Sequence, residues 1–403
     1  MTVSQRVQAL YQKYPYPARE PCEALDPYVD YVKSLSSVSS GKRPSFLDAG
    51  CGTGSLLLGA ALFNSHWDIY GCDFNAESLR MLQDDLDEMN LTNVTTRQVD
   101  LLDFPDDFGP PGGFDVIFCT GVIHHTEEPL KILKSLAARL APQGVLRLMV
   151  YADKGRSGLY RFSDAIQQIE RWRDLDLESR LQAARTLMTE LEHRKEKDGF
   201  RPPCLRGPFE GSHQLHPVEF VDRYLHPHDS PYTLKKLRSH IEQAGLRFYR
   251  WFEGRNWDLS ELLPQAFARG DFPEDSWEQF SVVEELFDRD QYDCYLVGPE
   301  FQPNDEAFSY DQPLRINPQV HLTETTFRGF PMSHQARLLF YPPEELSYPQ
   351  ARLLKAVSKT TASLGDLLNE WGEERSEEWL QVALYLLNRD LVYRPTDQAI
   401  DGS

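Results

Sequence analysis

The chain has 403 residues, 41% apolar and 12% aromatic, so it is long enough for two domains with sizeable cores. Its 62 acidic and 42 basic residues give a formal net charge of −20, which repels phosphate backbones and anionic lipid surfaces. We therefore expect neither nucleic acid nor a membrane as a partner. The first residues lack an apolar signal core, and no apolar run reaches the roughly 18 residues of a membrane span, so the sequence predicts a cytoplasmic protein.

The N-terminal segment, residues 1–44, is predicted to be a helical cap that contains a stiff aromatic stretch. Residues 4–12 fit a short helix, which ends at the Tyr-Pro-Tyr-Pro stretch that begins at Tyr14, because two prolines impose extended backbone. The rings of Tyr14 and Tyr16 are thereby held out from a rigid segment. They form either a strap over the core or the mouth of an active site, and we treat both as candidate substrate contacts.

A glycine-rich turn follows the short apolar run that begins at Ser45. An apolar run, a carboxylate, three alternating glycines and a second apolar stretch together fit a buried strand, a tight turn and a helix start. Glycine permits positive φ and a close approach of the backbone to a ligand, so we expect a ligand on this turn. The residues of the turn that we expect to contact it are Asp48, Gly50, Cys51, Gly52 and Gly54.

Strand and helix patterns then alternate, which predicts a parallel sheet with ligands at the carboxyl ends of its strands. The second strand, residues 68–72, is followed by Asp73, whose carboxylate can accept hydrogen bonds from both hydroxyls of a ribose. A third strand, around residues 94–99, is followed by Asp100. The spacing of Asp73 suits a nicotinamide dinucleotide or S-adenosylmethionine, whereas the glycine turn fits the dinucleotide fingerprint imperfectly, because Ser55 stands where that pattern has Gly or Ala.

The fourth strand, residues 114–120, is followed by a His-His-Thr-Glu-Glu-Pro segment that begins at His124 and opens a helix. A Pro-Gln-Gly turn at Pro142 then leads into a fifth strand that ends near Val150. With the glycine turn and the acids at the strand ends, this order resembles the class I S-adenosylmethionine-dependent methyltransferases. A nicotinamide dehydrogenase would not be expected to carry both the histidine segment and the Pro-x-Gly turn at these places. The Tyr-Pro-Tyr-Pro stretch is similar to the lead-in of a bacterial subgroup of that family.

The resemblance implies an α/β fold with a Rossmann-like, seven-stranded sheet over residues 45–300, whose last strand is antiparallel, and S-adenosylmethionine as the cofactor. It implies that Asp73 binds the ribose and that Asp100 accepts from the adenine amino group. The alternative for Asp100 is a loop acid or a helix cap. The further cofactor contacts that we expect are Phe74, Leu101 and Thr120.

Methyl transfer needs the acceptor atom in line with the sulfur–methyl bond, so positioning supplies most of the acceleration and few catalytic side chains are required. If the acceptor must lose a proton, His124 or His125 is the candidate base, because imidazole titrates near neutral pH. The alternative is that one histidine packs on the cofactor and the other faces solvent. Tyr151, at the end of the fifth strand, is a third candidate substrate contact.

An insertion is expected after the fifth strand, over about residues 153–232. It would contain two amphipathic helices, near residues 157–173 and 177–195, and a loop rich in proline, glycine and histidine. The insertion would act as a substrate lid or as a helical brace. The loop histidines match no metal-ligand spacing, so we expect no metal. These histidines are His213, His216, His226 and His228.

Residues 301–403 are expected to form a small accessory domain. Three helical segments, near residues 349–358, 362–371 and 376–389, and a short final strand suggest a winged-helix-like fold. The segment is similar to the carboxyl-terminal accessory domain of certain bacterial protein methyltransferases. Acidic residues open the third helix at Glu377, where a DNA-reading domain would carry arginine or lysine, so nucleic-acid recognition is disfavoured.

The sequence thus predicts an S-adenosylmethionine-dependent methyltransferase that modifies a protein side chain. A small-molecule methyltransferase of secondary metabolism is the close alternative, and a catalytically silent binding or assembly module is the alternative from another class. The intact glycine turn and Asp73 argue against the silent module. A narrower resemblance, in size and domain order, is to the phycobiliprotein asparagine methyltransferases. The family's amide methyltransferases often carry Asn-Pro-Pro-Tyr after the fourth strand, whereas this chain has Thr-Gly-Val-Ile from Thr120, which puts the usual carbonyl clamp in doubt.

Overall fold

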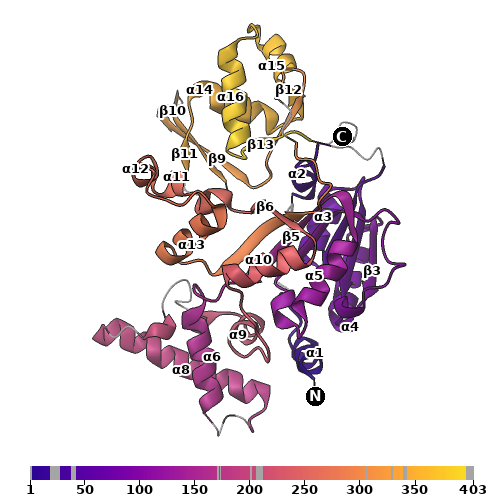
Figure 1. The fold of residues 1–403 in the computed structure, drawn as a ribbon, viewed down its shortest axis with the longest axis vertical. Helices are drawn as coiled ribbons and strands as arrows, with labels where there is room; N and C mark the ends of the chain where they lie inside the picture. Colours follow the sequence, from indigo (N-terminus) through magenta and orange to yellow (C-terminus); the bar gives the residue numbers. More distant parts are fainter. Residues whose placement is uncertain are drawn as a thin grey trace. The chain divides into compact units, whose positions relative to one another are not determined.

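The chain divides into two compact units in the structure, which is a computed structural model (Figure 1). The first unit comprises Met1–Leu25, Ser45–Ala61 and Trp67–Pro299, and the second comprises Asp26–Pro44, Leu62–His66 and Glu300–Ser403. The residues that the structure describes are 2–18, 28–37, 42–169, 172, 174–199, 202–205, 212–304, 307–327, 330–338 and 343–395.

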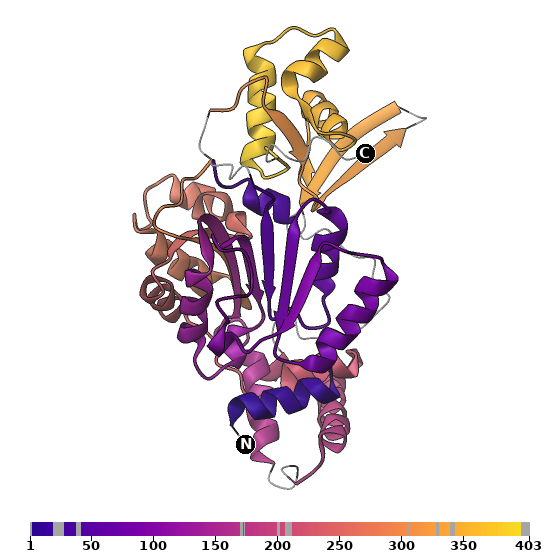
Figure 2. The same cartoon turned by 90° about the vertical axis from the view of Figure 1, so that its right-hand side faces the viewer.

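Within these described residues, the first unit contains a seven-stranded sheet in the order β3-β2-β1-β4-β5-β7-β6. Strands β1 to β5 are parallel to one another, and β7 is antiparallel to both of its neighbours. Figure 2 shows the strands of the first unit side by side as one layer. The predicted Rossmann-like sheet is confirmed. Its strands are β1 (Ser45–Ala49), β2 (Asp68–Asp73), β3 (Val94–Gln98), β4 (Phe114–Thr120), β5 (Leu140–Tyr151), β6 (Arg247–Trp251) and β7 (Gln291–Val297).

The central strands are apolar because helices cover both faces of a parallel sheet. Every residue of β1 is buried, and the rings of Phe46 and Phe118 meet edge to face across β1 and β4, with centroids 5.1 Å apart. One buried ion pair joins β5 to β7, where the Arg147 guanidinium donates to both carboxylate oxygens of Asp293, at 2.9 and 2.6 Å. Such a pair holds its strands in one register because either partner alone would be an uncompensated buried charge.

The helices of the first unit begin at residues with clear capping chemistry. The Asn75 side chain accepts from the backbone N–H of Glu77 and starts α4, and the Thr233 hydroxyl accepts from that of Lys236 and starts α10. Leucines on one face of each helix are buried against the sheet. The helices are α1 (Val3–Lys13), α3 (Ser55–Phe63), α4 (Ala76–Glu88), α5 (Pro129–Ala138), α10 (Leu234–Gln243), α11 (Leu259–Leu262), α12 (Pro264–Phe267) and α13 (Ser276–Leu286).

The segment after β5 carries the two predicted helices, α6 (Ser157–Gln168) and α8 (Leu177–Asp198), and a third, α9 (Pro217–Tyr224), which the sequence analysis missed. These helices share a core with α1, in which Leu10 packs among Phe162, Leu181 and Phe220. The N-terminal helix therefore belongs structurally with the insertion, although more than 100 residues separate them in the chain.

The second unit has its own core, built by three predicted helices and two small sheets. The antiparallel pair β9–β10 was not predicted. Residues 26–44 group with this unit and not with the expected N-terminal cap of residues 1–44. Long-range hydrogen bonds join the two segments, since the Tyr31 hydroxyl donates to Asp390 at 2.9 Å and the Tyr393 hydroxyl donates to Asp30 at 3.0 Å. The elements are α2 (Val29–Lys33), β8 (Pro313–Ile316), β9 (Val320–Phe327), β10 (Phe330–Leu338), β11 (Glu344–Glu345), α14 (Tyr348–Val357), β12 (Ala362–Ser363), α15 (Leu364–Trp371), α16 (Glu377–Asn388) and β13 (Val392–Tyr393).

Among the helices that the structure describes, none combines the length and the apolar character that crossing a bilayer requires.

Candidate functional site

A cavity of about 320 Å³ lies at the carboxyl ends of β1, β2 and β4, where Asp48, Asp73 and Thr120 face it. This edge is where open α/β sheets bind their ligands. The structure therefore brings together residues that the sequence analysis selected one strand end at a time. The predicted site residues that line the cavity are Tyr16, Asp48, Gly50, Cys51, Gly52, Asp73, Phe74, Asp100, Leu101, Thr120, His125 and Tyr151.

The glycine turn after β1 is held from two sides. The backbone N–H groups of Gly50 and Cys51 donate to the carbonyl of Cys72 on β2, at 2.8 and 3.0 Å. From the other side, Thr53 donates its N–H to the carbonyl of Tyr16 at 3.2 Å and its hydroxyl to that of Pro17 at 3.1 Å. The tyrosine-proline stretch is thus bonded directly to the turn and forms part of the cavity wall.

Gly52 shows why the turn requires glycine. Its φ is +53°, and a Cβ at this position would collide with the backbone oxygen of Tyr16. The backbone N–H of Gly52 donates to the Asp73 carboxylate at 2.9 Å, and that of Asn75 donates to the same carboxylate at 2.8 Å. Burial raises the pKa of Asp73, and these backbone donors oppose the rise. One carboxylate therefore joins the turn, the end of β2 and the start of α4.

Asp48 carries the most perturbed carboxylate of the cavity floor. It is 3% exposed, and burial, together with the nearby charge of Asp73, raises its pKa to about 7, although Arg147 opposes the shift. A carboxylate that costs this much to ionise is suited to a cationic ligand, which would favour the ionised form.

The Asp48→Asn variant gives a pH test of this burial. The pKa of Asp48 is about 7 in the folded protein, against an ordinary value of 3.8 that applies to the unfolded chain. The unfolded chain therefore loses this proton first, and the folded state loses stability as the pH rises from about 4 to about 7. Asparagine does not ionise, so the stability of the variant does not fall for this reason. Chemical denaturation at a series of pH values should show the variant gaining stability relative to the wild type across this range and no further above it. Parallel pH profiles for the two proteins would contradict the assignment.

The two candidate bases lie in different surroundings on the single turn η2 (Ile123–His125). His125 lines the cavity, and its Nδ1 lies 3.2 Å from the backbone oxygen of His228, so Nδ1 carries the proton. Burial lowers the pKa of His125 to about 3, which makes its neutral ring a weak proton acceptor. His124 is 0% exposed, does not line the cavity and packs on the Tyr151 ring with centroids 4.0 Å apart.

Three predicted site residues lie outside the cavity lining, for reasons of packing. Gly54 faces α4, where a Cβ would collide with Leu82, so this glycine serves the contact between two helices. The Tyr14 hydroxyl donates to Glu178 of α8 at 2.7 Å and points into the insertion. His124 lies behind His125, as described above.

Two functional candidates were missed by the sequence analysis. Tyr11 of α1 and Asp222 of α9 line the cavity together, and the Tyr11 hydroxyl donates to the Asp222 carboxylate at 2.8 Å. Burial raises the pKa of Asp222. Tyr11 was visible in the sequence only as part of the apolar face of a helix, and no local pattern marks Asp222.

A family model described as "Methyltransferase domain" matches residues 47–146, the segment that supplies the glycine turn, Asp73, Asp100 and both histidines of η2. The chain carries a class I S-adenosylmethionine-dependent methyltransferase domain. Its cofactor is S-adenosylmethionine.

The relatives of the chain cover different shares of its length. An uncharacterized protein of Synechococcus is 28% identical over 342 residues, which cover 79% of this chain and 77% of that protein. A ubiquinone biosynthesis O-methyltransferase of Actinobacillus pleuropneumoniae is 32% identical over 130 residues, which cover 32% of this chain and about half (53%) of that enzyme. The solved structure of PKMT2 from Rickettsia typhi in complex with AdoHcy matches with a TM-score of 0.70 and 15% identity, covering 95% of this chain and 78% of that one. This last likeness shows a shared fold.

Proposed function

We propose that the chain transfers the methyl group of S-adenosylmethionine to a protein side chain, and that the cavity at the ends of β1, β2 and β4 holds the cofactor. The observation that supports this proposal most strongly is the lining of the cavity, in which the carboxylates of Asp48, Asp73 and Asp100 lie in or just after the last residues of three different strands. Three acids at one sheet edge suit a ligand with a cationic sulfonium, a ribose and an adenine amino group.

Three parts of the cofactor have a proposed partner. The ribose hydroxyls donate to Asp73, whose carboxylate is already oriented by the backbone N–H groups of Gly52 and Asn75. The adenine ring lies beside Leu101, with its amino group on Asp100. The cationic methionine end lies toward Asp48, where a positive charge lowers the cost of ionising that carboxyl.

Any proton that leaves the acceptor needs a base at the cavity wall. His125 stays neutral because burial lowers its pKa to about 3, so it accepts a proton poorly. Asp222 lines the same cavity and has a raised pKa, which makes it the better acceptor of the two. Acceptors that need no deprotonation would depend on positioning alone.

The second unit supports a macromolecular acceptor. All the lining residues of the cavity that the structure describes belong to the first unit, so we assign the cofactor to that unit and a different role to the second. It nevertheless has a complete core, which includes Leu353, Leu354 and Leu386. Binding energy from such a remote unit can accelerate transfer to a large acceptor and is useless for a small one. The net charge of −20 favours a protein over a nucleic acid.

Two other acceptors remain candidates. A small molecule is favoured by the 32% identity to a ubiquinone biosynthesis O-methyltransferase, which extends over 130 residues of this chain. An asparagine side chain, as in the phycobiliprotein type, is a narrower form of the protein proposal. The segment Thr120-Gly121-Val122-Ile123 offers no side-chain amide for the usual clamp, so an amide acceptor would have to be held by other groups.

Transfer of a labelled methyl group decides between these acceptors. A cell lysate is dialysed, and its protein fraction and its small-molecule fraction are kept separate. Each fraction is then incubated with the purified chain and with adenosylmethionine labelled on the S-methyl group. We expect label in the protein fraction, retained after strong base if it is bound to nitrogen and lost if it is an ester. A Gly52→Ala protein serves as the control for cofactor-dependent transfer. Label in the small-molecule fraction alone would overturn the protein acceptor and leave the methyltransferase assignment intact.

A further inference from the structure

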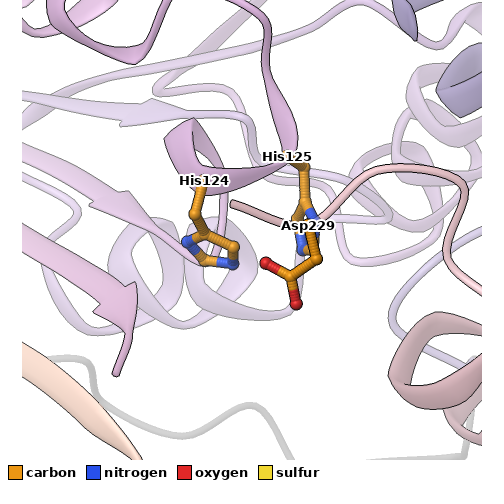
Figure 3. A group of neighbouring side chains, drawn as sticks. All are labelled: His124, His125 and Asp229. Atoms are coloured by element: carbon orange, nitrogen blue, oxygen red, sulfur yellow. The ribbon is translucent and has the colours of Figure 1, made fainter. Parts of the chain in front are cut away.

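A cluster of histidine and aspartate side chains lies directly behind the cavity. His124 and His125 come from η2, whereas Asp229 comes from the loop between α9 and α10. This loop is fixed to the turn because Ser230 donates its N–H to the carbonyl of His124 at 2.8 Å. Figure 3 shows the three side chains converging, with the Asp229 carboxylate beside the two rings. One ligand-type atom from each residue lies within 4.8 Å of the other two.

Three polar atoms of this cluster are buried without a hydrogen-bond partner among the described residues. His124 is 0% exposed, and neither of its ring nitrogens has a hydrogen-bond partner among the described residues. Within the same described ranges, Oδ1 of Asp229 is also buried without a partner, while its Oδ2 accepts from the Tyr160 hydroxyl at 3.2 Å. Buried polar atoms without partners are rare and costly, so their concentration at one point calls for a ligand.

The hydrogen bonds also determine which histidine ring nitrogens have a lone pair available for a metal ion. Because Nδ1 of His125 faces a carbonyl oxygen, it carries the proton, and Nε2 is left as an acceptor. A second possible triad, His125 with Asp222 and His226, fails this test. Nδ1 of His226 accepts from the backbone N–H of His228 at 3.2 Å, so the proton of its neutral ring lies on Nε2 and blocks coordination there.

We propose that His124, His125 and Asp229 bind one divalent transition-metal ion. Two neutral imidazoles and one carboxylate suit zinc or iron(II), and they do not suit magnesium or calcium, which prefer oxygen ligands. The Tyr160 hydroxyl and the His228 carbonyl orient two of the ligands from outside. His125 is the ligand that also lines the cavity, so a bound ion would lie next to the cavity wall, where it would act as a Lewis acid toward an acceptor oxygen or nitrogen.

Cobalt(II) tests the site without any knowledge of the methyl acceptor. The full-length chain is treated with a chelator, dialysed and titrated with cobalt(II), whose visible absorption reports imidazole coordination. We expect saturation at about one ion per chain, with zinc displacing cobalt and magnesium failing to do so. Absence of a saturable absorption band, or displacement by magnesium, would overturn the proposal.

Two substitutions remove proposed ligands, and two others serve as comparisons. His124→Ala and Asp229→Asn are each expected to weaken cobalt binding at least about tenfold, whereas His193→Ala, which removes an exposed histidine of α8, should leave it unchanged. Asp229→Asn preserves side-chain size and carries the test if circular dichroism shows that His124→Ala does not fold. Unchanged cobalt binding in folded Asp229→Asn would overturn the proposal. So would loss of binding in Asp222→Asn with retention in Asp229→Asn, because the other triad would then hold the ion.

Discussion

Gly52→Ala is expected to lower the affinity for S-adenosylmethionine at least about 100-fold, or about 2.7 kcal/mol. The added Cβ would meet the Tyr16 backbone oxygen, which is part of the main chain and cannot move away by changing rotamer. The residue would also keep a φ of +53°, which alanine adopts only with strain. The turn would therefore shift, and the Gly52 N–H would lose its bond to Asp73. Isothermal titration calorimetry with adenosylmethionine measures the loss.

Gly199→Ala is the matched control for Gly52→Ala. Gly199 has a φ of +63°, but a Cβ there would meet nothing within 4 Å, so this change isolates backbone strain from collision. We expect a small loss of stability and no change in cofactor affinity. Wild-type affinity in a folded Gly52→Ala protein would show that the cofactor does not depend on this turn.

Asp73→Ala is expected to weaken S-adenosylmethionine binding by about 1.5–3 kcal/mol, or roughly 10- to 150-fold. The substitution removes a charge-assisted acceptor of ribose hydroxyls and also the acceptor that orients the N–H groups of Gly52 and Asn75. Unlike Gly52→Ala, this substitution adds no atom to the cavity wall, so its expected range begins at a smaller loss. Calorimetry on the variant provides the measurement.

Two further variants test whether the charge of Asp73 and its position on β2 matter for cofactor binding. Asp73→Asn keeps a hydrogen-bonding oxygen without the charge and should fall between the wild type and Asp73→Ala. Asp68→Ala removes an aspartate from the opposite end of the same strand β2 and should bind the cofactor normally. Equal affinities for Asp73→Ala and the wild type would mean that the ribose is bound elsewhere.

The central sheet and most of its cavity could be predicted because their signals are local. A buried parallel strand is a short apolar run, and its carboxyl end is the residue at which that run stops. Asp48, Asp73 and Thr120 were found in this way, and all three line one cavity. The antiparallel pairing of β9 with β10 carried no comparable signal because both strands mix apolar and polar residues and contain no continuous apolar run.

The residues that were missed depend on long-range packing. Asp222 reaches the cavity because α9 packs beside α1, which is more than 200 residues away in the chain. The same packing separates two neighbouring tyrosines, since Tyr16 lines the cavity while Tyr14 is bonded to Glu178. Asp229 meets η2 only through the loop that bonds to His124. No spacing rule along the sequence predicts these long-range contacts.

A crystal structure of the chain with adenosylhomocysteine tests the account most directly. We predict the ligand in the cavity at the ends of β1, β2 and β4, with both ribose hydroxyls within hydrogen-bond distance of the Asp73 carboxylate. The adenine should lie against Leu101 with its amino group on Asp100, and the sulfur should face the wall formed by His125. A ligand bound outside this cavity, or one whose ribose is turned away from Asp73, would contradict the assignment.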